Sequence, residues 1–122
     1  MARSTLALAA VLSVASTSLA GDLVTPPVYV GDSTNATCRL LNITSAPIPA
    51  QLELIDSNTG VMLLGSGSIT VPAGIAVRLE FDHVNHVVYC RFVNVSKSKV
   101  RADMTTYVPA GDESNQVVVV AQ

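Results

Sequence analysis

The chain has 122 residues, of which 49% are hydrophobic and 13% are charged, and it contains two cysteines and no tryptophan. Its formal net charge of −2 argues against a nucleic-acid partner, because the phosphate backbone attracts strongly basic surfaces. Aromatic residues make up only 4% of the chain, so stacking platforms for bases or sugars are poorly supplied and the core must be aliphatic.

The first twenty residues have the three zones of a secretory signal peptide. A basic start at Arg3 precedes an apolar run over residues 6–14, and a tail of small residues ends at Ala20. The run is shorter than the roughly 20 residues that span a bilayer, and no later stretch is long enough to do so. We expect cleavage after Ala20, a secreted or periplasmic product without a transmembrane segment, and a single domain over residues 21–122.

Short stretches rich in β-branched residues, separated by turn residues, predict a series of strands after the signal. Residues 23–30 contain two consecutive prolines, which suit an edge strand because proline cannot donate to a ladder. Further strands are expected over residues 36–43, 50–55, 61–64 and 69–71.

The second half of the domain continues this pattern. Residues 75–82 alternate strictly between apolar and polar side chains, as a strand with one buried face does. The remaining strands are expected over residues 87–95, 100–108 and 116–121. A turn over residues 96–99 is expected to join the first two of these strands in a hairpin. Seven to nine short strands without helical periodicity predict an all-β fold, a β-sandwich.

The two cysteines are expected to form a disulfide bond. Cys38 and Cys90 each lie in the middle of a predicted strand, and both strands have the pattern Cys-Arg-x-x-Asn. An exported chain meets an oxidising compartment, and the spacing is not that of a CxxC redox motif. A bridge between strands so far apart in sequence predicts an inter-sheet disulfide across the core.

Three motifs together resemble a class of short exported bacterial proteins of unassigned function. The motifs are Thr37-Cys38-Arg39-Leu40-Leu41-Asn42, Val71-Pro72-Ala73-Gly74 and Tyr89-Cys90-Arg91-Phe92. The turn before the alternating strand also resembles the one that precedes a core strand in immunoglobulin-like sandwich modules. The resemblance implies an immunoglobulin-like β-sandwich and an extracytoplasmic address, and it brings no catalytic residues with it.

One candidate metal site lies in the loop between two predicted strands. Asp82, His83 and His86 combine a carboxylate with the only two imidazoles, which are ligand types that suit zinc or copper. A stable site usually needs three or four protein ligands, so a polar loop without metal is the alternative interpretation.

A second candidate is a basic rim on the predicted hairpin, formed by Arg91, Lys97, Lys99 and Arg101. These are four of the six basic residues that remain after cleavage, while the rest of the domain is acidic. Such a rim would suit an anionic polymer or a protein partner. A solvated hairpin is the alternative interpretation.

Strict alternation has a consequence for the cysteine strands. If Cys38 and Cys90 point inward, apolar residues such as Leu41 and Val95 point outward, unless a bulge or a strand end at the Asn of each motif turns them. Otherwise a terminal segment or a second molecule covers them, so self-association stays open. Three Asn-x-Ser/Thr sequons, at Asn35, Asn42 and Asn94, fall at strand ends and are interpreted as incidental to them.

The function indicated by these features is a non-enzymatic binding or structural module with no cofactor. It would act through the basic hairpin. The alternative is a small metal-binding or metal-dependent protein that uses Asp82, His83 and His86.

Overall fold

Ten strands form in the part of the chain that the computed structural model describes, residues 21–108 and 117–122. The proposed signal peptide lies outside the described residues. The strands are β1 (Gly21–Val24), β2 (Val28–Val30), β3 (Asn35–Asn42), β4 (Ile48–Asp56), β5 (Met62–Gly65), β6 (Ile69–Val71), β7 (Ala76–Phe81), β8 (His86–Val95), β9 (Val100–Tyr107) and β10 (Val117–Val120).

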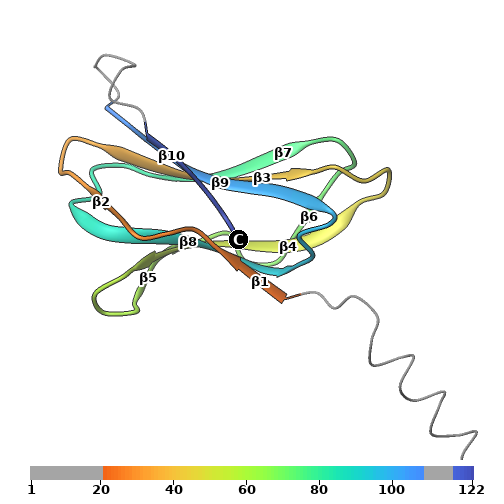
Figure 1. Cartoon of the computed structure of the whole chain (residues 1–122), viewed down its shortest axis with the longest axis horizontal. Helices are drawn as coiled ribbons and strands as arrows, with labels where there is room; N and C mark the ends of the chain where they lie inside the picture. Colours follow the sequence, from red (N-terminus) through yellow and green to blue (C-terminus); the bar gives the residue numbers. More distant parts are fainter. Residues whose placement is uncertain (1–20, 109–116) are drawn as a thin grey trace, which may run out of the picture.

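The strands form two antiparallel sheets that stack face to face (Figure 1). Sheet A has the order β1-β8-β4-β5, with β2 also paired to β8 and β6 also paired to β4. Sheet B has the order β10-β9-β3-β7. The predicted all-β sandwich is therefore confirmed, and the apolar face of each strand packs between the two sheets.

The two prolines divide the first predicted strand into β1 and β2. Both pieces pair with β8, and the gap between them falls at Pro26 and Pro27. Thr25 fills this gap, because its hydroxyl accepts a hydrogen bond from the backbone N–H of Cys90 at 2.9 Å and its own N–H donates to the Cys90 carbonyl at 3.0 Å. The ladder along β8 is thus maintained by a side chain where proline interrupts it.

The predicted disulfide is present and joins the two sheets. Cys38 on β3 and Cys90 on β8 are fully buried, with their Cα atoms 5.7 Å apart. The fully buried side chains around them are mostly aliphatic; the largest are Phe92, Leu40, Leu52, Leu54 and Met104. A core of this kind agrees with the low aromatic content of the sequence.

The prediction that the strands before and after residues 96–99 form a hairpin is wrong. β8 belongs to sheet A, whereas β9 belongs to sheet B and pairs with β3 and β10. A turn closed by the bond from the Lys99 N–H to the Ser96 carbonyl crosses from one sheet to the other. The residues on its two sides, Val95 and Val100, are both buried, so the connection is held at the end of the core.

A bulge at Asn94 makes this crossing feasible. Asp22 pairs with Val93 and Gly21 pairs with Val95, so that Asn94 is an extra residue in β8. Asn94 has φ of 65°, a left-handed conformation that asparagine tolerates better than most residues. The bulge turns Val95 inward, as one of the two sequence-based alternatives expected.

Asn42 ends the other cysteine strand and is completely buried. The nitrogen of its side-chain amide lies 2.8, 3.0 and 3.2 Å from the carbonyl oxygens of Ala46, Val71 and Pro72, so that its two hydrogens are shared among three acceptors. Its side-chain oxygen accepts from the N–H and the hydroxyl of Thr44 at 2.9 and 2.7 Å. One side chain therefore satisfies the turn after β3 and the end of β6, two segments about thirty residues apart.

The immunoglobulin-like assignment stays a prediction. As in immunoglobulin domains, the disulfide joins one central strand of each sheet. In that fold, however, the strand of the second cysteine and the strand that follows it share a sheet, whereas β8 and β9 lie in different sheets.

The disulfide is expected to contribute a large share of the stability. Cys38 and Cys90 are 52 residues apart, and closing a loop of that length in the unfolded chain is worth about 4 kcal/mol in the chain-entropy model. Urea denaturation with and without reductant should show a loss of that size in the free energy of unfolding. The double change Cys38→Ala with Cys90→Ala should lose as much and no longer respond to reductant. Two free thiols in the denatured, unreduced protein would contradict the bond.

Asn42→Ala should be strongly destabilising, because it leaves the carbonyls of Val71 and Pro72 without their buried donor. We expect a loss of about 3 kcal/mol in the free energy of unfolding measured by urea denaturation. Asn94→Gly is the matched control, since glycine adopts a positive φ readily and Asn94 is exposed. The control should change stability by less than about 0.5 kcal/mol. Equal effects of the two changes would contradict the structural role of Asn42.

Candidate functional site

The outward side of sheet A presents a partly apolar exposed surface. On β8, Cys90 and Phe92 point into the core, so that the residues that alternate with them point to the outside. The registers of β1, β4 and β5 place further outward residues beside them. We define the sheet A outer face by the residues Val24, Glu53, Ile55, Met62, Tyr89 and Arg91.

Large apolar side chains lie exposed on this face and at its margin. Val24 is 41% exposed and Met62 52%, while Tyr29 on β2 and Val61 before β5 are 65% and 58% exposed. Ile55, by contrast, is only 2% exposed although it is not part of the core between the sheets. It pairs with Tyr89 on one side and with Met62 on the other, so a small apolar cluster lies on the outside of the sheet.

A shallow hollow lies on this face beside Tyr89. It has a volume of about 270 Å³, and its lining residues are Val24, Thr25, Pro27, Ser57 and Tyr89. The hollow lies where the prolines lead the chain from β1 to β2, and the Thr25 bonds to Cys90 hold its wall in place. A break in the sheet edge thus produces a concave surface with an aromatic side chain beside it.

Arg91 lies on the sheet A outer face and is neutralised there by Glu53. Its Nη2 and Nε atoms lie 2.6 and 2.7 Å from Oε1 of Glu53, on the neighbouring strand β4. This hydrogen bond raises the pKa of Arg91 above its ordinary value. The pair adds a polar group to the apolar face without adding net charge.

The other residues of the predicted basic rim lie elsewhere. Lys97 and Lys99 are exposed in the turn between the sheets, and Arg101 points outward from sheet B. The guanidinium of Arg101 folds back on the turn and donates to the carbonyls of Val100 and Lys97 at 2.9 and 3.5 Å. Arg91 belongs to sheet A and therefore lies apart from Lys97, Lys99 and Arg101, which remain together as a smaller basic turn.

The candidate metal ligands have separate partners. Nδ1 of His83 lies 2.9 Å from the carbonyl oxygen of Asp32, which can only accept, so this nitrogen carries the proton. Nδ1 of His86 lies 3.1 Å from Oδ2 of Asp56. The structure does not bring Asp82, His83 and His86 together into a set that could hold a metal ion, and residues 21–108 and 117–122 contain no other such set of three or more His, Cys, Asp or Glu.

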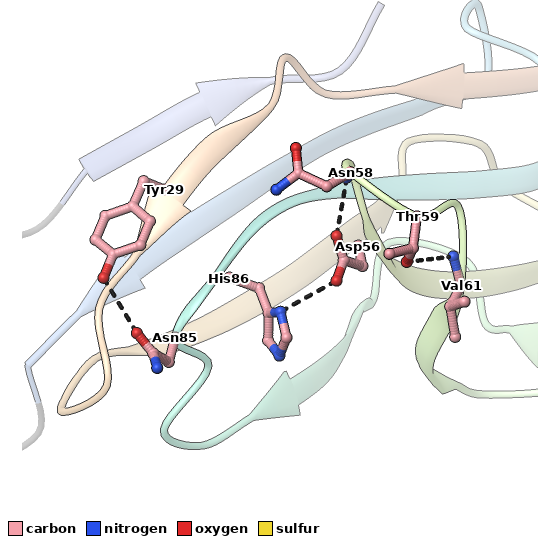
Figure 2. A network of polar contacts seen from close by, with 7 residues as sticks. All are labelled: Tyr29, Asp56, Asn58, Thr59, Val61, Asn85 and His86. Atoms are coloured by element: carbon pink, nitrogen blue, oxygen red, sulfur yellow. Dashed lines mark hydrogen bonds and ion pairs between the residues drawn. The ribbon is translucent and has the colours of Figure 1, made fainter.

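Asp56 lies next to this surface and was not among the residues singled out from the sequence. Figure 2 shows its carboxylate between His86 and the turn that follows β4. One oxygen accepts the N–H of Asn58 at 2.8 Å, and the adjacent Ser57 N–H donates to the Val87 carbonyl at 2.7 Å. Asp56 thereby holds Ser57 at the wall of the hollow, and the turn signal that begins with Asp56 in the sequence was the available clue.

Tyr29 on β2 also has a polar partner. Its hydroxyl donates to Oδ1 of Asn85 at 3.1 Å, as Figure 2 also shows. Asn85 has a positive φ of 51° and lies in the loop before β8. The exposed ring of Tyr29 therefore has a defined position, which lowers the entropy that a partner would have to remove on binding.

Comparison with known proteins supports the fold but assigns no family. No family model matches the chain, and neither does any curated protein. The crystal structure of Thermotoga maritima 1070 is similar, with a TM-score of 0.57 and 8% sequence identity over 87% of this chain and 96% of that one. FlgD from Xanthomonas campestris, a protein of flagellar hook capping, gives a TM-score of 0.32 and 13% identity over 84% of this chain and 68% of its own. The first likeness concerns the fold alone, and the second is too low to carry an argument.

No helix among the described residues is long and apolar enough to cross a membrane.

Titration calorimetry with Zn²⁺ and Cu²⁺ tests the metal hypothesis directly. We expect no stoichiometric binding, because the imidazoles of His83 and His86 bond to different acceptors. The double change His83→Ala with His86→Ala should give the same baseline as the unchanged protein. Binding of one equivalent of metal that the double change abolishes would contradict this prediction.

Proposed function

We propose that this chain is an exported, non-enzymatic binding module that recognises a protein partner through the sheet A outer face. The observation that carries the proposal is the exposed apolar and aromatic surface around the hollow at Tyr89, with Arg91 neutralised at its centre. Among the described residues, no set of three or more His, Cys, Asp or Glu side chains favours the metal-dependent alternative.

The composition of the face supports a protein as the partner. Tyrosine, methionine and arginine are enriched in the buried centres of protein–protein interfaces, and aromatic and arginine side chains often carry most of the binding energy. The face has all three types at Tyr89, Met62 and Arg91. An anionic polymer would find no net positive charge there, because Glu53 lies against Arg91.

The extracytoplasmic location rests on two independent features. The sequence begins with the three zones of a signal peptide, and the domain contains a buried disulfide between Cys38 and Cys90. Structural disulfides persist in oxidising compartments and are rare in the cytosol. Both features favour a partner that is met in the periplasm or outside the cell.

Photo-crosslinking from the two outer faces would test the proposed surface. A photoreactive residue at Tyr29 or Met62 reports on sheet A, and one at Arg78 of β7 reports on sheet B. We expect a specific crosslinked protein in the native extracytoplasmic fraction from the first two positions and not from the third. The crosslinked protein is then identified by mass spectrometry and purified.

Affinity measurements with the purified partner complete the test. The double change Met62→Ser with Tyr89→Ser should weaken binding by about 30-fold, the effect of losing a hot spot worth about 2 kcal/mol. Arg78→Ser is the control on the opposite sheet and should leave the affinity unchanged. Equal crosslinking from both sheets, or an unchanged affinity of the double variant, would overturn the proposed surface.

A further inference from the structure

The four sheet edges of the described domain differ in how they are protected against pairing with another chain. The β1–β2 edge is interrupted by Pro26 and Pro27, and β5 has a register shift in its pairing with β4. The β7 edge strand carries the charges of Arg78 and Glu80. Prolines, bulges and charges are the usual devices that prevent edge-to-edge association. β10 consists of four valines and has none of them.

The backbone of β10 shows which of its groups point away from β9. The Ala121 N–H donates to the Ala102 carbonyl of sheet B, and the Gln122 N–H points the other way and donates to the Val24 carbonyl of β1. Because backbone groups alternate in direction along a strand, the N–H and C=O groups of Val118 and Val120 also point away from β9. They form an edge to which no other described strand is paired.

β1 does not continue along this edge because of its prolines. Val24 and Gln122 exchange both backbone hydrogen bonds, at 3.1 and 2.9 Å. In this antiparallel register the residue facing Val120 would be Pro26, which has no N–H, and the chain turns from there toward β8. The same dipeptide that protects the edge of sheet A thus leaves the edge of sheet B open.

We propose that β10 pairs antiparallel with β10 of a second copy of this chain, so that sheet B continues across a two-fold axis. Val118 of one copy then pairs with Val120 of the other, and each supplies the outward N–H and C=O that its partner needs. The strand is self-complementary because valine faces valine at positions 118, 119 and 120. The other edges are less suitable, because the β1–β2 edge, β5 and β7 carry the proline, bulge and charge devices described above, and β6 has only three residues.

The side chains favour the same arrangement. Val118 is 51% exposed and Val120 is 62% exposed, and both point to the outer side of sheet B. Across the two-fold axis they form one apolar stripe of valines from both copies, so that pairing removes this surface from water. The paired segment is short, and we therefore expect a weak dimer.

Sedimentation of the mature protein tests the proposal. Between about 10 µM and 1 mM the average mass should rise toward twice the monomer mass, with a dissociation constant inside that interval. Val118→Pro removes one outward N–H without removing a bond to β9, and should remain monomeric over the whole range. Val118→Thr keeps both the N–H and the β-branched shape, and should dimerise as the unchanged protein does.

Hydrogen exchange provides a second measurement. Amides of Val118 and Val120 should exchange more slowly as the concentration rises, while those of Arg78 and Glu80 on β7 should not change. If Val118→Pro fails to fold by circular dichroism, Val118→Lys with Val120→Lys replaces it, because like charges would then meet across the axis. Three results would overturn the proposal: an unchanged protein that stays monomeric at about 1 mM, a folded proline or double-lysine variant that dimerises as strongly as the unchanged protein, or open-ended larger assemblies.

Discussion

The covalent link between Cys38 and Cys90 fixes the distance between the two central strands of the sandwich. β3 has β7 and β9 as neighbours, and β8 has β1, β2 and β4. The outer strands β5, β6 and β10 are joined to these neighbours rather than to the cysteine strands themselves. With few aromatic side chains to fill the space between the sheets, a bond that sets their separation reduces the number of aliphatic packings that the core can adopt.

The strands themselves were predictable from the sequence because alternation is a local property. The predicted range of 69–71 coincides with β6, and the range of 100–108 differs from β9 by one residue. The partner of a strand is not local, and here the interpretation of two consecutive strands as a hairpin was wrong. The bulge at Asn94 turns Val95 inward, and the chain consequently enters the turn in a direction that leads to the other sheet.

The contrast between local alternation and the pairing of distant strands also explains which features of the candidate surface could be predicted. That Arg91 points outward follows from its place beside Cys90. Its neutralisation by Glu53 depends on the register between β4 and β8, because the two residues are 38 positions apart in the sequence. A short-range pattern does not reveal such a register. The hollow at Tyr89 likewise needs the pairing of both β1 and β2 with β8, although the two prolines that produce it were recognised as a feature of an edge strand.

The buried position of Asn42 has a consequence for the choice of a host in which to make the protein. Asn42 begins an Asn-x-Thr sequon, and a glycosylating secretory pathway attaches sugar to nascent chains before they fold. A glycan on this nitrogen would occupy the amide that reaches Val71 and Pro72 and would have to be placed inside the protein. An export route that oxidises cysteines without N-glycosylation would therefore suit production of the folded domain.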